Sequence, residues 1–327
     1  MNTRQVIDEL CHRSPKEAWE FVARCVESIC FDPMDRGNVI GELTSRDRSV
    51  GEIDHFLATA GWDLWQTYEL AIERTSQRLE RWWNGINEAK AILVLDGLSA
   101  REVPWILQGA RDRGYHIGQV LVTGAELPGD TNTFARALGF SSRSQLQNHM
   151  GKSSLLNPCR TETIDLPWHD CMGLIDTTPN WIFWHHWPDN KLHADGGLGH
   201  GLDSLSLNMA EQLSSGEFWE FVGYLATGRR LIITSDHGYA ATNLFFDGAG
   251  EQNQFLKELF RGGRFIEGFR DVGRFVPPLA MNLASSRGNF TYALGRRKWK
   301  SPGGYPSLVH GGLSILEMLS PFVELYA

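Results

Sequence analysis

The 327-residue chain lacks several features that mark large classes of proteins. Its five cysteines form no Cys-x-x-Cys pair, which argues against a zinc finger or a disulfide framework and favours reduced thiols. No run of about 18 apolar residues occurs, and the opening residues MNTRQVIDEL lack the apolar stretch of a signal peptide. The net charge of −8 leaves no general excess of cations for coating nucleic acid. We therefore expect a soluble cytoplasmic protein without a membrane partner.

Two kinds of functional motif are also missing. The stretch from Asn190 to Leu205 is rich in glycine, but it matches neither Gly-x-Gly-x-x-Gly nor a phosphate loop ending in Gly-Lys-Ser/Thr. We predict only a long loop there. The chain has no Gly-x-Ser-x-Gly element, which disfavours a serine hydrolase, and Cys159 and Cys171 stand in no sulfatase-like signature.

The residues that are present predict two regions. In residues 1–88, capping boxes at Ser14–Glu17 and Ser49–Glu52 precede apolar residues at helical spacing, and the second predicts one long helix to Trp82 and Trp83. Residues 89–327 carry short apolar runs interleaved with helical patterns, including a third capping box at Ser99–Glu102. The predicted strands are Ala91–Leu95, Gly118–Thr123, Trp181–Trp184 and Leu231–Thr234.

This alternation is typical of an α/β fold, with a mostly parallel sheet flanked by helices. No repeat or flexible linker separates the two regions, so we expect the N-terminal helical region to pack on the α/β body.

Polar residues follow two of the predicted strands. Asp96 ends the run Leu93–Leu95, and Asp236 and His237 follow Leu231–Thr234. Because ligands bind at the carboxyl ends of parallel strands, these positions are candidates for chemistry. A turn residue alone would also explain Asp96, but it explains the adjacent Asp and His less well.

Two further segments carry possible metal ligands. Asp189 and His193 stand four residues apart after the strand at Trp181–Trp184, and His310 precedes a glycine pair near the end of the chain. For His185 and His186, which lie in or just after that strand, we expect a satisfied core or supporting role. Three Asp and three His residues would suffice for two divalent cations, which can hold both the attacking and the leaving oxygen of a phosphoryl group.

Such chemistry needs a nucleophile. Thr131 and Thr133 lie at a predicted helix start in the segment LPGDTNTFAR, although ordinary helix capping explains a hydroxyl there equally well.

The order of these segments resembles the alkaline-phosphatase superfamily, and within it most closely the PglZ domain known from bacterial phage-defence systems of the BREX type. The resemblance rests on LVLDGLSAREVPW from Leu93, the Leu-Pro-x-x-Thr element at Leu127, LIITSDHGY from Leu231 and HGGLSILEM from His310. It covers roughly residue 90 to the end. The resemblance implies an alkaline-phosphatase-like fold and a metal-dependent phosphodiesterase or phosphatase, acting on nucleotides or nucleic acid together with other phage-defence proteins.

Carried over by position, the resemblance implies two metal sites and a nucleophile. Asp189, His193 and His310 would hold one ion, and Asp96, Asp236 and His237 the other. Thr131 would be the nucleophile, with Thr133 as the alternative because Gly129-Asp130 departs from the usual pair before that threonine. The ions would be zinc, with manganese or magnesium as alternatives.

The substrate contacts are less marked in the sequence. The run from Gly295 to Lys300 holds four cations and a Trp, so Arg296 and Arg297 are candidate phosphate contacts, as are Arg101 and Arg136 near predicted helix starts. A solvated surface run explains the cations equally well. Two alternative functions stay open: a phosphomonoesterase, and a scaffold or binding subunit of a defence complex with little catalysis.

Overall fold

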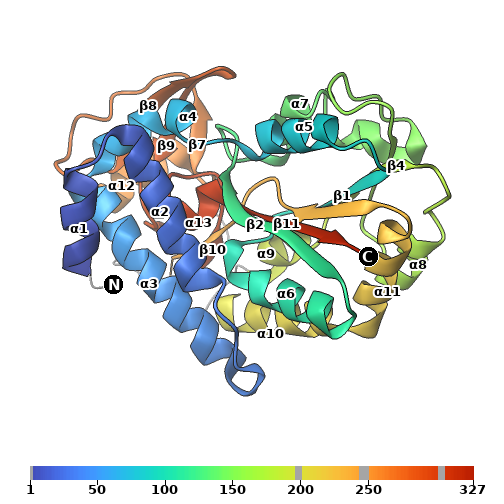
Figure 1. Ribbon diagram of the computed structural model, residues 1–327. Coiled ribbons are helices and arrows are strands. Elements are labelled where there is room, and N and C mark those ends of the chain that lie inside the picture. Colours follow the sequence, from blue (N-terminus) through green and yellow to red (C-terminus); the bar gives the residue numbers. More distant parts are fainter. Residues whose placement is uncertain (1–2, 196–200, 243–249, 301–305) are drawn as a thin grey trace.

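A six-stranded sheet in the order β2-β11-β5-β1-β4-β3 forms the centre of the molecule in this computed structural model (Figure 1). Its strands are β1 (Lys90–Leu95), β2 (His116–Gly124), β3 (Arg160–Ile164), β4 (Asn180–His185), β5 (Arg230–Thr234) and β11 (Leu319–Tyr326). Strands β3, β4, β1 and β5 pair in parallel, and β11 runs antiparallel to both of its neighbours. The structure describes residues 3–195, 201–242, 250–300 and 306–327.

Helices cover both faces of this sheet. Alternate residues of β1 point to opposite sides, so Leu93 joins one apolar core and Val94 another. One face carries α6 (Val103–Asp112), α8 (Trp168–Met172), α10 (Gly201–Ser214) and α11 (Gly216–Ala226), and the other carries α5 (Thr75–Gly85) and α7 (Thr131–Ala137). Burial on both faces explains why the strands appear in the sequence as continuous apolar runs. The predicted α/β fold class is confirmed.

The N-terminal region is helical, as predicted. It contains α1 (Thr3–Cys11), α2 (Pro15–Cys30), α3 (Val39–Thr59) and α4 (Tyr68–Ala71), with 3-10 turns at Arg36–Asn38 and Trp62–Thr67. Ser14 caps α2 through the predicted box, but the box at Ser49 is wrong because that residue lies inside α3. The Ser49 hydroxyl donates to the carbonyl of Ser45 one turn earlier, so its hydrogen bond is satisfied within the helix. The single long helix predicted to reach Trp83 is instead several elements.

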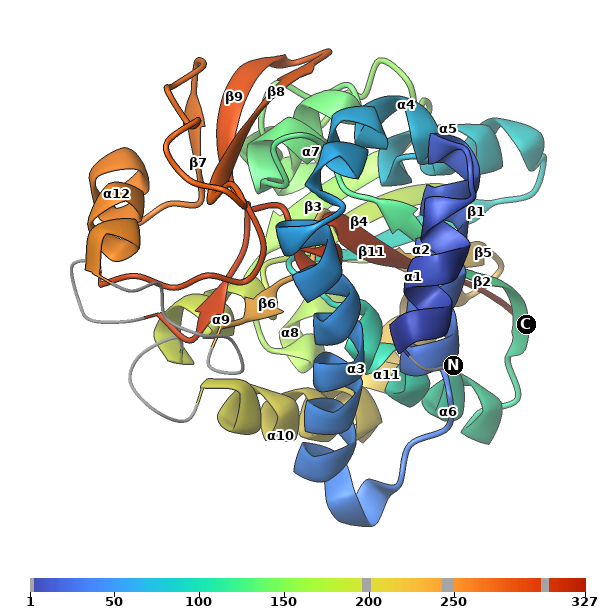
Figure 2. The same ribbon diagram turned by 90° about the vertical axis from the view of Figure 1, so that its left-hand side faces the viewer.

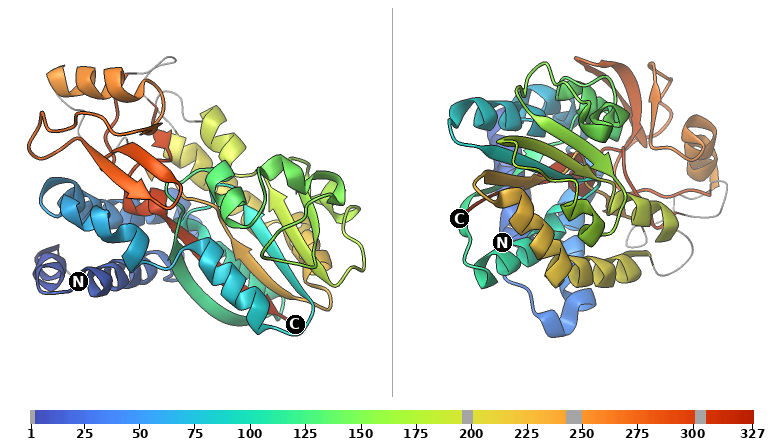
Figure 3. Two further views of the ribbon diagram at one scale, coloured as in Figure 1. Left: turned by 90° about the horizontal axis from the view of Figure 1, so that it is seen from above. Right: turned by 90° about the vertical axis from the view of Figure 1, so that its right-hand side faces the viewer.

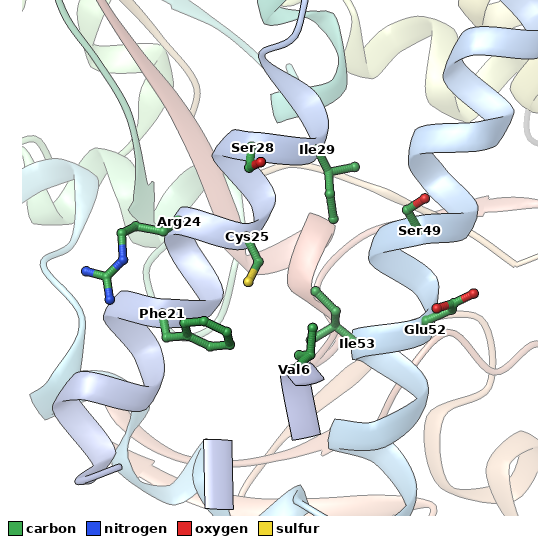
Figure 4. A pocket seen from close by; sticks show the side chains of 9 residues that line it. All are labelled: Val6, Phe21, Arg24, Cys25, Ser28, Ile29, Ser49, Glu52 and Ile53. Atoms are coloured by element: carbon green, nitrogen blue, oxygen red, sulfur yellow. The ribbon is translucent and has the colours of Figure 1, made fainter. Parts of the chain in front are cut away.

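The helical region packs against the body. Figure 3 shows the blue helices of this region lying against the rest of the chain. Side chains of α2 and α3 share an apolar core with the start of β11 and with two further strands, β8 (Ala280–Ser285) and β9 (Gly288–Ala293). A cavity of about 350 Å³ lies between α1, α2 and α3, lined by Phe21, Cys25 and Ile53, with Arg24 and Glu52 also on its walls (Figure 4). The groups of metal-ligating side chains found among the described residues lie elsewhere. The division at residue 88 stays a prediction.

A smaller unit, which we call the cap (residues 250–300), lies beside the central sheet (Figure 2). It consists of α12 (Gly250–Phe260), β7 (Phe265–Glu267), β8 (Ala280–Ser285) and β9 (Gly288–Ala293), with the strands in the antiparallel order β7-β9-β8. Leu256, Phe260 and Trp299 belong to its own core. Short strands β6 (Ala240–Ala241) and β10 (Leu308–Val309) pair between the cap and the sheet, followed by α13 (Ile315–Met318).

Some of the remaining predictions about the fold are confirmed and one is wrong. The four predicted strands and the capping box at Ser99 are confirmed. The long loop after Asn190 is wrong for its described part, because α9 (Asp189–Asp195) and α10 occupy it; Gly196, Gly197 and Gly199 lie outside the described residues. All five cysteines are free thiols. Among the described residues, no helix combines the length and apolar character needed to cross a membrane.

Candidate active site

The strand register brings the candidate residues to one edge of the sheet. Leu95 pairs with His185, and Val94 pairs with Thr234, so β1, β4 and β5 end at the same level. Asp96 follows β1, Asp236 follows β5, and Asp189 begins α9 after β4. These three carboxylates converge because the carboxyl ends of neighbouring parallel strands share an edge.

Gly97 makes the turn after β1 possible. Its backbone lies at φ +76°, and an added Cβ would lie 3.0 Å from Leu192 and 3.4 Å from Asp189. In this conformation the backbone N–H of Gly97 donates to Asp236 Oδ1 at 3.0 Å. The N–H of Asp189 donates to the carbonyl of Asp96 at 2.9 Å. Glycine at this position therefore ties the ends of three strands together.

Asp96, Asp236 and His237 form an inner group in which all three side chains are fully buried. His237 Nε2 lies 3.5 Å from Asp236 Oδ2 and 3.8 Å from Asp96 Oδ1. Burial and the Asp236 carboxylate raise the pKa of Asp96 well above its usual value. Burial opposes the charged form of His237, but Asp236 and Asp96 raise its pKa to about 9.

Asp189, His193 and His310 form an outer group at the surface. Asp189 Oδ2 lies 3.3 Å from His193 Nε2, and its Oδ1 lies 3.5 Å from His310 Nε2. The two histidine Nε2 atoms are 3.4 Å apart. Burial opposes ionisation of Asp189, but its hydrogen bond to His193 and the neighbouring histidine side chains lower the pKa of Asp189 to about 2. Burial and the neighbouring His237 lower the pKa of His310 to about 3.

The two groups adjoin through a pair of histidines. The rings of His237 and His310 stack with centroids 4.2 Å apart and planes 9° from parallel. One ring belongs to the inner group and the other to the outer group, so the two groups lie side by side. Within each group, every pair of potential ligand atoms lies within 4.8 Å.

Unsatisfied atoms of the two groups fit divalent cations. Asp236 Oδ2, His237 Nε2 and Asp189 Oδ1 are buried and have no hydrogen-bond partner among the described residues. A buried polar atom without a partner costs about 1–3 kcal/mol, so three of them in two adjoining groups call for a ligand. Carboxylate oxygens and imidazole nitrogens are donors that suit zinc and manganese, and magnesium less well. The donor set therefore fits one cation at each group.

The two candidate nucleophiles have different surroundings. The Thr131 hydroxyl is partly exposed and donates to Asp96 Oδ1 at 3.4 Å. Thr133 is fully buried, and its hydroxyl donates to Asp130 Oδ2 at 2.6 Å, within the cap of α7. Thr131 therefore faces the inner group, whereas Thr133 serves the helix start.

Two side chains that sequence reasoning missed hold Asp96. The Arg143 guanidinium forms an ion pair with Asp96 Oδ2, and the indole N–H of Trp184 donates to the same oxygen at 3.1 Å. Arg143 begins a 3-10 turn, Arg143–His149, and its side chain is 28% exposed. Nothing in the polar stretch around Arg143 has a helical or strand period, so the sequence offers no signal for it. Trp184 is hidden within an apolar strand.

The arginines proposed from the sequence lie elsewhere, which corrects two assignments. Arg101 and Arg296 are fully buried, and both pair with Asp47 of α3. A side chain with no exposed surface and a carboxylate partner is a structural ion pair, so we withdraw them as substrate contacts. Arg136 is exposed and donates to Thr133 Oγ1 at 3.2 Å, and Arg297 is half-buried. Those two stay predictions.

The basic run at residues 295–300 is also not the solvated surface run considered as its alternative. Trp299 belongs to the core of the cap, and its indole donates to the carbonyl of Arg261 at 2.8 Å. His185 is satisfied, as expected, because its Nε2 bonds to the carbonyl of Leu166 at 2.8 Å and its Nδ1 accepts from Trp187 N.

Comparisons with known proteins give a distant similarity in structure. No family model matches the chain, and no curated protein matches it. Among solved structures, the chain is similar to an inactive variant of murine ectonucleotide pyrophosphatase/phosphodiesterase 5 in complex with AMP, with a TM-score of 0.45 and 11% sequence identity. The similarity covers 73% of this chain and 88% of that chain. The function proposed below therefore depends on this chain's own side chains.

Proposed function

We propose that the chain is a phosphoester hydrolase that uses two divalent cations, zinc or manganese. The observation that carries this proposal is the convergence of six Asp and His side chains, in two adjoining groups, beside the Thr131 hydroxyl. Asp96, Asp236 and His237 would hold one ion, and Asp189, His193 and His310 the other. When bound, two such cations stabilise charge on the attacking and leaving oxygens of a phosphoryl group.

Thr131 is the proposed nucleophile. Its oxygen attacks phosphorus, the bond from phosphorus to the leaving oxygen breaks, and the leaving oxygen takes up a proton. The hydroxyl donates toward Asp96 Oδ1, which orients it beside the inner group; its proton passes to bulk water, and bulk water protonates the leaving oxygen. Water then hydrolyses the phosphothreonine, which frees Thr131 and releases the phosphate product.

Arg143 and Trp184 keep Asp96 in place during this reaction. Both bond to Oδ2 and leave Oδ1 facing Thr131 and His237. The Arg143 side chain also keeps 28% of its surface exposed, and a guanidinium suits an anionic phosphoryl group. We assign it to binding the phosphoryl group.

Nucleotides or nucleic acid ends are the proposed substrates, and a bacterial phage-defence system is the proposed setting. Both rest on the sequence resemblance to the PglZ domain, not on a residue of the site. The phosphomonoesterase alternative has the same ion and nucleophile requirements. A scaffold subunit, in contrast, has no physical need for six converging ligand side chains.

One assay series separates these functions. Hydrolysis of p-nitrophenyl phosphate, bis-p-nitrophenyl phosphate and thymidine 5′-p-nitrophenyl phosphate is measured with zinc and with manganese, for wild type, Thr131→Ala and Asp236→Ala. We expect turnover of the diesters and loss in both variants. Turnover of the monoester alone would favour the phosphomonoesterase. A wild type that binds no metal and hydrolyses none of the three would favour the scaffold. Phage plating on cells carrying Asp236→Ala then tests the defence role.

A further inference from the structure

Glu317 is a fully buried acid in α13 whose side chain holds the loop after His310. Its Oε1 accepts from the backbone N–H of Gly312 at 2.9 Å, and its Oε2 accepts from the Ser314 hydroxyl at 2.6 Å. Gly312 lies two residues after His310, so the carboxylate fixes the backbone that carries this outer-group histidine.

The backbone of Glu317 holds the inner group. Its carbonyl accepts from the N–H of Gly238 at 3.1 Å, directly after His237. A Cβ at Gly238 would lie 2.1 Å from the carbonyl oxygen of Leu316, so the turn after β5 is pressed against α13. One residue therefore contacts the backbone of both groups, on the two segments whose histidine rings stack at 4.2 Å.

The cap supplies the counter-charge. Arg264, just before β7, donates from Nε to Glu317 Oε1 at 2.8 Å and from a second nitrogen to Oε2 at 3.3 Å. It also donates to the carbonyls of Gly295 and, at 2.7 Å, Arg297, both in the cap. Figure 1 shows α13 between the cap and the central sheet. The ion pair thus joins the cap to the point where both groups are fixed.

We propose that Glu317 is a positioning residue that sets the spacing of the two metal groups, and that Arg264 couples the cap to that spacing. The inference rests on the proposed function, because it assigns Glu317 a role toward the same ions. Among the described residues, it makes no hydrogen bond or ion pair with any of the six ligands, so it acts through Gly238 and Gly312. Partners beyond the ligands commonly change metal affinity by about 10–100-fold.

Glu317→Gln tests the proposal, and Glu324→Gln is its matched control. Glu324 is also buried, lies on the following strand β11, and accepts from Arg230 at 2.6 Å, from Trp82 at 2.8 Å and from the N–H of Gln119 at 3.2 Å. Both substitutions remove one buried charge from an arginine pair. Only the first lies beside the two groups.

Two measurements are made on the full-length variants. Zinc affinity is determined by competition with a chromophoric chelator, and we expect Glu317→Gln to lose about 10–100-fold while Glu324→Gln matches wild type. Amide hydrogen exchange is followed without metal in peptides containing Gly238 and Gly312, and we expect faster exchange in both for Glu317→Gln only. Arg264→Lys, which keeps the charge but not the two-nitrogen contact, should show a smaller loss in the same direction.

The outcomes separate the two proposals. If wild type binds zinc and Glu317→Gln binds it equally well, the positioning role is wrong and the proposed function stands. If wild type binds neither zinc nor manganese, the proposed function fails and the metal role of Glu317 fails with it, whatever the exchange data. If Glu317→Gln does not fold, Arg264→Lys decides: wild-type zinc affinity in that variant overturns the coupling to the cap and the positioning role.

Discussion

The imidazole rings of His237 and His310 lie in stacked contact, with centroids 4.2 Å apart and planes 9° from parallel. His237 follows a central strand of the sheet, whereas His310 follows β10, far along the chain. Each ring belongs to a different group of potential metal ligands, so the inner and outer groups meet at the stacked rings. Because the ligand sets are separate, the two cations of the proposed site should be removable one at a time.

Single substitutions should therefore empty one group each. His310→Ala removes a ligand of the outer group only, and Asp236→Ala removes one of the inner group only. We expect two zinc ions per chain in wild type and one in each variant, measured by elemental analysis after dialysis. Anomalous scattering from crystals of the variants would locate the ion that remains. Loss of both ions in each variant would contradict separate groups.

Zinc should also stabilise the fold. Bound cations neutralise converging carboxylates, and zinc at about 100 times its dissociation constant adds about 2.7 kcal/mol to the free energy of unfolding. We expect the melting temperature of wild type to fall with a chelator and to recover on zinc addition. Asp236→Asn keeps the outer group and should respond less than wild type, and without zinc it should be less stable because the buried, charged His237 loses a carboxylate partner. If neither the chelator nor added zinc changes the melting temperature of wild type, zinc does not stabilise the fold.

The hydroxyl at residue 131, and not that at residue 133, should be required for turnover. Thr131→Ser keeps an attacking hydroxyl and should retain part of the activity. Thr131→Ala removes the nucleophile and should lower the activity by at least about 100-fold. Thr133→Ala breaks a buried hydrogen bond to Asp130 and should cost about 1 kcal/mol of stability with activity preserved. Mass spectrometry of quenched reactions should find the phosphoryl group on Thr131. A phosphopeptide carrying it on Thr133 would reverse the assignment.

Arg143 should matter more than Arg136 for phosphoester turnover. Hydrogen bonds to charged groups contribute about 1.5–3 kcal/mol, so Arg143→Ala should lower kcat/KM by about 10–100-fold. Arg143→Lys should lose less but not recover fully, because an ammonium cannot bond two oxygens in a fixed plane. Arg136→Ala is the comparison, since that side chain is exposed and bonds to Thr133. A larger loss in Arg136→Ala would move the phosphate contact to α7.

Strand ends could be located from the sequence because apolar runs stop abruptly at Asp96 and Asp236. The register of parallel strands then brings such ends together, which needs no knowledge of distant contacts. The segments carrying Asp189, His193 and His310 could be found as motifs, but their meeting depends on α9 and on the pairing of β10 with β6. That pairing has no local signal, so the sequence alone leaves the outer group as separate fragments.

The arginine side chains were predicted least well, because the positive charge of a residue does not reveal whether it is buried. Arg101 and Arg296 lie in sequences that look like surface, yet both are buried against Asp47, which is far away in the chain. Arg143, the arginine that reaches Asp96, stands in a polar segment without any period. Long-range ion pairs of this kind depend on how α3 packs on the body, and no spacing rule encodes that packing.

The buried ion pairs of Asp47 give a final prediction, on the stability of the protein and on whether its helical region and α/β body unfold together. Arg101 pairs with Asp47 and donates to the carbonyl of Tyr239 at 2.8 Å, so α3 is linked to the segment that carries His237. Asp47→Ala leaves Arg101 and Arg296 without this carboxylate and should cost about 3–5 kcal/mol. Glu42→Ala on the same helix removes a partly exposed partner of Arg46 and should cost at most about 1 kcal/mol.

Calorimetry distinguishes two forms of that loss. If the helical region and the α/β body unfold together, Asp47→Ala lowers the temperature of a single unfolding transition. Near that temperature a larger fraction of the variant is unfolded, so its apparent zinc affinity falls as well. Two separate transitions, with only the first shifted by Asp47→Ala, would instead make residues 1–88 an independent unit. We expect the single transition, because α2 and α3 share one apolar core with β11 and with the cap, and a core shared by three parts cannot be lost from one of them alone.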